Sequence, residues 1–134
     1  MLQPKKIQHR KMHKNKKKRK AGRGHSLSFG SYGLKSLEPA WITSAQIESA
    51  RRTVARAVQR GGKLWIRIFP DQPRTKKGAE VGMGGGAGSL DHFVAPIGAG
   101  RMLFEIDGVT EELARNAFRL ATHKLPVKTK FIKK

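Results

Sequence analysis

The chain has 134 residues, of which 29 are Lys or Arg and only 9 are Asp or Glu, so its formal net charge is +20. This length fits one domain with a modest core, and the lack of cysteine excludes disulfides and thiolate metal sites. No apolar run approaches the ~18 residues of a membrane span, and no apolar segment follows the basic N-terminus as in a secretory signal. The charge instead predicts a polyanionic partner, and nucleic acid is our leading hypothesis.

The first 25 residues form a basic extension without any acid. Its eleven cations, all predicted to bind RNA, are Lys5, Lys6, Arg10, Lys11, Lys14, Lys16, Lys17, Lys18, Arg19, Lys20 and Arg23. Such a segment buries too little apolar surface to offset its ordering entropy, so we expect it to be disordered until RNA neutralises it. An anionic membrane would require large apolar side chains along one face, and a basic surface without a dedicated polyanion is the third alternative. Residues 26–134 are predicted to form the folded domain.

The first predicted elements are a strand and a helix. Residues 26–37 alternate apolar side chains with serines, which predicts a strand bent at its glycines. A helix is expected to begin after Thr43, because Thr43 and Gln46 have the spacing of a capping box. Gly61–Gly62 is expected to end it as a C-cap.

This predicted helix separates its apolar residues from its arginines. The apolar positions at helical spacing are Ile47, Ala50, Val54, Ala57 and Val58. Arg52, Arg56 and Arg60 step by four residues along roughly the opposite side. Glu48 can pair with Arg52, but no acid stands at helical spacing from Arg56 or Arg60. We interpret the row as facing RNA; a merely solvated face is the alternative.

Residues 63–69 show the clearest strand alternation, with one aliphatic face and one face that carries Trp65, Arg67 and Phe69. We favour Trp65 and Phe69 as a second packed face covered by a helix over direct contact with RNA. For Arg67 the two interpretations stay open.

Residues 74–88 lack periodicity and are predicted to form a long loop, which in a compact domain is usually functional or disordered. Lys76 and Lys77 near its start are candidate RNA contacts. The run that follows is Gly82, Met83, Gly84, Gly85, Gly86, Ala87 and Gly88. It formally matches G-x-G-x-x-A, but that dinucleotide pattern requires a buried strand before it and a helix after it. We therefore expect no nucleotide cofactor.

The remainder of the chain predicts strands at 91–97 and 101–106, a helix capped by Thr110, and a final basic strand or extended tail at 125–132. The expected buried stripe of this helix is Leu113, Ala117, Leu120 and Ala121. Lys128 and Lys130 in the last segment are further candidate RNA contacts. Two helices among several strands predict a single α+β domain.

No set of residues suits catalysis or metal binding. His9 and His13 have the spacing of a helical zinc pair but lie among lysines without a third ligand. Ser89, Asp91 and His92 are triad residue types, yet neighbours on one strand cannot take up triad geometry. We expect no enzyme activity, no metal and no cofactor.

Several segments together resemble the bacterial family of large-subunit ribosomal protein sixteen. In order along the chain they are residues 1–6, 29–34, 42–48, 65–71, 108–115 and 124–131. The resemblance implies a hammerhead-like α+β domain that binds 23S rRNA, helps to shape the aminoacyl-tRNA site and joins the large subunit late in assembly. It also implies that the basic extension and the glycine-rich loop run into rRNA, with the loop towards the tRNA side.

The partners that this resemblance implies are 23S rRNA, neighbouring large-subunit proteins and A-site tRNA, with the 5S rRNA region and P-site tRNA as further candidates. We expect neither a membrane partner nor a homo-oligomer. The expected location is the cytoplasmic ribosome of a bacterium, or else an organelle ribosome. The alternative function is that of a free-standing basic nucleic-acid-binding or chaperone protein.

The chain departs from the family pattern in the loop. Lys77 is followed by Gly78 where relatives typically have Lys-Pro, and cations common in the family are absent at Gly82, Gly85 and Ala87. An arginine oxygenase that acts in some relatives at the position of Gly82 would find no side chain. Backbone N–H groups can still approach RNA closely there, since glycine permits it.

Overall fold

The computed structural model describes residues 1–14, 19–59 and 61–134. The elements in chain order are β1 (Tyr32–Ser36), β2 (Ala40–Thr43), α1 (Ser44–Ala57), β3 (Lys63–Ile66), β4 (Gln72–Lys76), β5 (Ser89–Ile97), β6 (Met102–Asp107), α2 (Glu111–Thr122) and β7 (Thr129–Lys133). Two helices and two antiparallel sheets form one small domain, which confirms the predicted α+β class.

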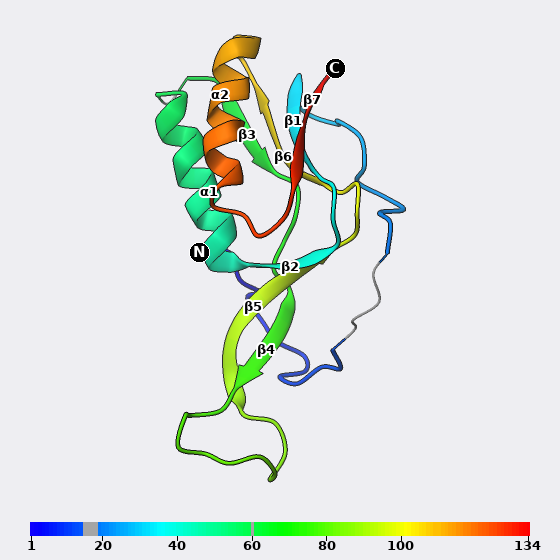
Figure 1. Cartoon of the computed structure of the whole chain (residues 1–134), viewed down its shortest axis with the longest axis vertical. Coiled ribbons are helices and arrows are strands. Elements are labelled where there is room, and N and C mark those ends of the chain that lie inside the picture. The colour runs from blue at the N-terminus through cyan, green and yellow to red at the C-terminus, as the bar shows by residue number, and fades with distance from the viewer. Residues whose placement is uncertain (15–18, 60) are drawn as a thin grey trace.

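The two sheets have different places in the molecule. One has the strand order β3-β6-β1-β7 and the other the order β2-β5-β4, with antiparallel neighbours throughout. Helices α1 and α2 lie side by side and cover one face of the four-stranded sheet (Figure 1). The β4–β5 hairpin leads away from this body as an arm, with the glycine-rich loop at its far end (Figure 1).

Helix α1 begins as predicted. The Thr43 N–H donates to Gln46 Oε1 at 2.9 Å and the Gln46 N–H donates to Thr43 Oγ1 at 3.2 Å, which is the reciprocal capping box. The helix ends at Ala57, before the predicted glycine pair, because Gln59 already takes a left-handed φ of +52°. A side chain on Gly62 would collide with the backbone of Asp107, so this glycine allows close approach to the end of β6.

The buried side of α1 is the predicted one, whereas that of α2 is rotated. Thr110 caps α2, since its Oγ1 accepts from the Leu113 N–H at 3.3 Å. Ala117 and Ala121 are buried as expected, but Leu113 and Leu120 are only half-buried, and Ala114 and Phe118 are buried instead. The Phe118 ring centroid lies 6.1 Å from that of Phe131 on β7, so contact with the last strand decides which side of α2 faces inward.

The strand predicted at 26–37 begins only at Tyr32. The N–H groups of Ser28, Phe29 and Gly30 donate to Glu105 Oε1 at 2.8, 3.1 and 3.2 Å instead of pairing with a strand. Residues 24–30 thereby lie over the face of the four-stranded sheet that the helices leave open.

The prediction of a loop from residue 74 is wrong for residues 74–76, which belong to β4 and pair with β5. The sequence does not show the hydrophobic alternation of a strand here, because the buried residue Arg74 is charged. Arg74 lies with its Cζ 4.1 Å from the ring centroid of Trp41 on β2. Strand β2 itself was missed, since four residues before a helix cap carry too little pattern. The strands predicted at 91–97 and 101–106 are confirmed as β5 and β6.

Candidate nucleic-acid interface

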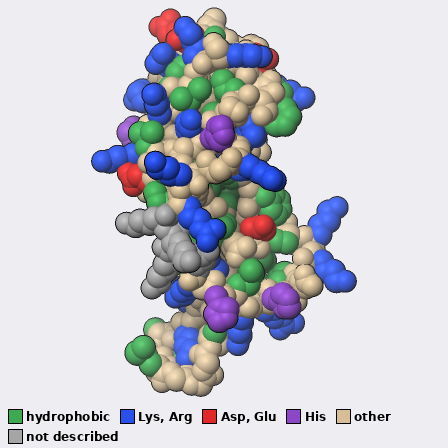
Figure 2. Space-filling view, turned by 90° about the vertical axis from the view of Figure 1, so that its right-hand side faces the viewer, with side chains coloured by type: hydrophobic (Ala, Val, Ile, Leu, Met, Phe, Trp, Pro, Cys, Tyr) green, Lys and Arg blue, Asp and Glu red, His purple; other side chains and the backbone are tan. Residues whose placement is uncertain are grey.

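Most of the positive charge of the described residues is left without a carboxylate. The only cations of Lys or Arg type that pair with an acid in this part of the chain are Arg51, Arg52, Arg67, Arg115 and Lys133. Figure 2 shows Lys and Arg side chains spread over one face of the body, with few carboxylates between them. The described surface is therefore strongly cationic, as the sequence predicts.

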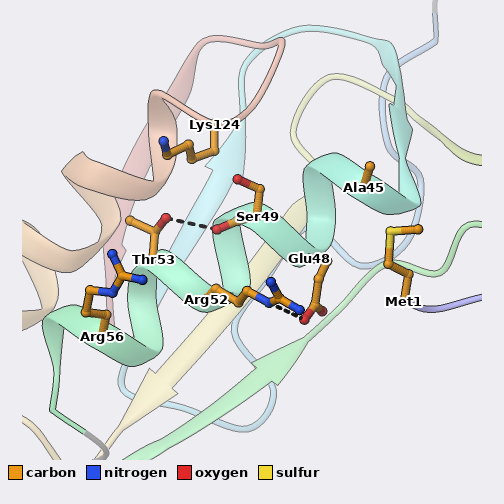
Figure 3. Close-up of a pocket in the computed structure, with 8 residues that line it drawn as sticks. All are labelled: Met1, Ala45, Glu48, Ser49, Arg52, Thr53, Arg56 and Lys124. Atoms are coloured by element: carbon orange, nitrogen blue, oxygen red, sulfur yellow. Dashed lines mark hydrogen bonds and ion pairs between the residues drawn. The ribbon is translucent and has the colours of Figure 1, made fainter.

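A hollow of about 370 Å³ lies between α1 and the segment that follows α2 (Figure 3). Arg52 and Arg56 from α1 line it together with Lys124, and Met1 closes the end near Ala45. Within the described ranges neither Arg56 nor Lys124 has an acidic partner. The packing of the two helices thus brings two uncompensated cations to one concave surface.

Glu48 limits what the arginine row can offer. Its carboxylate accepts from Arg51 at 2.6 Å and from Arg52 at 3.0 Å. The hydrogen bond from Arg51, aided by Arg52, lowers the pKa of Glu48 to about 2, so the carboxylate stays charged. Arg52 is therefore partly neutralised, as predicted, while the pairing with Arg51 was missed. Arg60 lies outside the described residues.

A second hollow, also of about 370 Å³, continues past Arg56 and Lys124 to Leu120 and His123. The two hollows share Thr53, Arg56 and Lys124, and we call their common stretch the helix groove. Sequence reasoning did not single out Lys124, because only the packing of α1 against α2 places it beside Arg56.

The basic extension passes three parts of the domain. It starts beside the first turn of α1, and the Nζ of Lys11 donates to the carbonyl of Ala87 in the loop at 3.2 Å. Further on, Ala99 exchanges backbone bonds with Arg19 and Ala21 at 2.9 and 2.8 Å, and the Met102 N–H donates to Gly24 at 2.7 Å. The end of the extension is therefore fastened to the domain by its backbone.

The predicted cations of the extension are exposed wherever the structure describes them, although Lys11 also reaches the loop. The exposed ones are Lys5, Lys6, Arg10, Lys11, Lys14, Arg19, Lys20 and Arg23. Lys16, Lys17 and Lys18 lie outside the described residues. The disorder predicted for the free extension and its boundary at residue 25 stay predictions, although the backbone bonds of Arg19, Ala21 and Gly24 show that this end of the extension is ordered against the domain.

The loop at the end of the arm spans residues 77–88. Lys77 donates from Nζ to the carbonyl of Gly84 across the loop, and Lys76 is exposed, so both stay candidate RNA contacts. Gly84, Gly85 and Gly86 have φ of +107°, +73° and +85° with open space around each. These glycines serve the backbone conformation rather than tight packing within the domain.

The remaining candidates separate into exposed and structural residues. Lys128 and Lys130 are exposed, Lys130 on β7 at the edge of the four-stranded sheet. Arg67, left open by the sequence, forms an ion pair with the fully buried Glu105. Trp65 is covered by the ring of Phe29 rather than by a helix, so that expectation was wrong; Phe69 is 48 % exposed.

Neither helix in the part of the chain described is long and apolar enough to cross a bilayer. Among the same residues, no group of three or more His, Asp or Glu side chains is placed to hold a metal ion.

A cationic groove, a basic extension and a loop-bearing arm on one small α+β body define a class of protein whose surface suits RNA within a larger assembly. The chain belongs to the family Ribosomal protein L16p/L10e, whose family model matches residues 4–132. It is accordingly a large-subunit ribosomal protein with a structural role in translation, and proteins of this kind are generally not enzymes.

Proposed function

We propose that this protein binds 23S rRNA through its basic extension and the helix groove, and that it thereby helps to shape the aminoacyl-tRNA site. The observation that carries the proposal is the pair of uncompensated cations, Arg56 and Lys124, on one concave surface. A concave site with two cations can surround a phosphate, and neutralising phosphates releases their condensed counterions. Membership in a large-subunit ribosomal family supports rRNA as the polyanion.

The extension has a complementary role in this proposal. Its exposed cations add phosphate contacts without base specificity, because a Lys or Arg on a flexible chain can follow any backbone path. Lys76, Lys128 and Lys130 are proposed as further contacts at the arm and at the edge of the four-stranded sheet. We also propose that neighbouring large-subunit proteins contact this protein, and that it acts in the cytoplasmic ribosome of a bacterium.

The arm is proposed to carry the loop at residues 77–88 towards A-site tRNA. Its glycine backbone offers N–H groups without side chains that would block RNA. We propose 5S rRNA and P-site tRNA as lesser candidates for the same surface, and we propose that the protein acts as a single copy without catalysis.

The test combines sedimentation with salt dependence. Wild-type protein should co-sediment in stoichiometric amount with large subunits through a moderate salt wash. The double variant Arg56→Ala, Lys124→Ala should fold normally, bind 23S rRNA more weakly and flatten the plot of log K against log salt by about 0.9 for each phosphate that it no longer neutralises. Arg115→Ala is the matched control, since Glu111 already neutralises that arginine at 3.1 Å. Equally weakened binding by both variants would contradict the groove as the RNA site.

The second candidate is a free-standing nucleic-acid-binding or chaperone protein, which the non-selective cations of the extension favour. In that case the protein would be recovered on bulk DNA or free RNA rather than on large subunits.

A further inference from the structure

Phe29 is a large apolar side chain held in place with much of its surface in water. The residue is 58 % exposed, although its ring stacks on Trp65 with centroids 5.9 Å apart and an interplanar angle of 18°. The guanidinium carbon of Arg67 lies 5.3 Å from the centroid of the same ring. Trp65 and Arg67 therefore both contact the ring, while more than half of the residue stays exposed.

The backbone around Phe29 is fixed more firmly than an exposed loop requires. Three successive N–H groups, those of Ser28, Phe29 and Gly30, donate to the same oxygen of buried Glu105. A Cβ on Gly30 would stand 2.6 Å from the carbonyl oxygen of Ile106, so the chain is pressed against β6 at this point. An aromatic ring that is pre-positioned in this way loses little conformational freedom when a partner binds.

The surroundings of the ring carry positive charge. Lys63 is exposed and places its Nζ 5.2 Å from the centroid of Trp65. Arg101 donates to the backbone carbonyls of Arg67 at 2.8 Å and Arg23 at 3.2 Å, so its guanidinium lies beside the segment that carries Arg67. The carboxylate of Glu105 is buried and paired with Arg67, whereas that of Asp107, opposite Lys63 in the strand register, accepts a hydrogen bond from the Ser31 hydroxyl at 2.8 Å. An exposed aromatic ring with the cation Lys63 on the neighbouring tryptophan complements a nucleotide, whose base is flat and whose phosphate is negative.

From this arrangement we propose that Phe29 is a stacking platform for one unpaired RNA base, with Lys63 contacting the phosphate of the same strand. The proposal rests on the proposed function, because it takes rRNA as the partner. It adds that single-stranded RNA, rather than a duplex, meets this face of the sheet. Stacked bases in a helix have no free face for an aromatic ring, whereas an unpaired base does.

The experiment compares three probes on the full-length protein: a short oligoadenylate, an abasic oligonucleotide of equal length, and an RNA duplex. Phe29→Leu keeps an apolar side chain on Trp65 but removes the aromatic face. It should bind oligoadenylate roughly tenfold more weakly, with unchanged affinity for the abasic strand and for the duplex and an unchanged salt slope. Phe29→Trp should restore binding. Phe69→Ala is the matched control, since this exposed phenylalanine has no aromatic or cationic partner among the described residues.

The outcomes separate this proposal from the one on which it rests. The stacking site alone would be overturned if the wild type binds all three probes with a steep salt slope and Phe29→Leu binds oligoadenylate as tightly as the wild type does. The absence of any salt-dependent RNA binding by the wild type would overturn both. If Phe29→Leu binds every probe normally but fails to enter large subunits, the ring meets a neighbouring protein and the stacking proposal is wrong.

Discussion

Replacing Glu105 by Ala should destabilise the fold more than the loss of any exposed carboxylate. The Glu105 side chain is fully buried, accepts three backbone N–H groups on one oxygen and pairs with Arg67 through the other. Its removal leaves the guanidinium of Arg67, whose side chain is only 14 % exposed, without its counter-charge. The substitution therefore disrupts both the four-stranded sheet and the packing of residues 24–30 on it.

The magnitude follows from these contacts. Breaking a buried ion pair by removing one partner costs about 3–5 kcal/mol. The N–H of Gly30 is buried as well, and leaving it without an acceptor adds about 1 kcal/mol. A total of about 4–6 kcal/mol is comparable to the whole stability of many small domains, which starts at about 5 kcal/mol.

The assay is urea unfolding followed by tryptophan fluorescence. With a slope of about 1.5 kcal/mol per molar urea, the midpoint should fall by about 3–4 M for Glu105→Ala. Glu105→Gln keeps the shape and one acceptor oxygen, so its midpoint should fall between those of the wild type and Glu105→Ala. Glu111→Ala removes an exposed carboxylate from Arg115 and Lys133 and should leave the midpoint almost unchanged. A shift in Glu105→Ala no larger than in Glu111→Ala would refute the reasoning.

Three further predictions concern acid, RNA and the loop. Burial raises the pKa of Glu105, but the hydrogen bonds that its carboxylate accepts outweigh this and hold the pKa below its usual 4.5. Because a lowered pKa stabilises the fold only while the carboxylate is charged, the urea midpoint should fall as the pH drops below about 4.5. Glu105→Gln should flatten this dependence on pH. Arg56→Ala should leave the thermal melt unchanged while weakening 23S rRNA binding in filter assays. Phe104→Asp should instead unfold the domain by burying an unpaired charge. Similar melting temperatures for the two variants would contradict the placement of Arg56 on the surface and of Phe104 in the core. Ala87→Lys should strengthen RNA binding without changing the melt, and more so than Gly85→Lys, whose φ of +73° disfavours a side chain; a larger gain from Gly85→Lys would show that RNA binding rearranges the loop.

Local patterns in the sequence determined much of the architecture. The capping box at Thr43 and Gln46 fixed the start of α1, since both partners lie within four residues. Period-two and helical spacing located β5, β6, both helices and the buried side of α1 for the same reason. The charge excess identified a polyanionic partner, because net charge does not depend on the fold.

Other features arose only from contacts between distant segments. Strand β4 escaped prediction because Arg74 is buried by a tryptophan 33 positions earlier in the chain, on β2. The helix groove forms because Lys124 and Arg56 line the same hollow. The position of Phe29 depends on the carboxylate of Glu105, 76 residues further along the chain. The sequence by itself determined the class of partner and the helices, whose signals lie within a turn or two of chain. The tertiary structure alone decided which cations share a surface, because such proximity comes from packing and leaves no local pattern in the sequence.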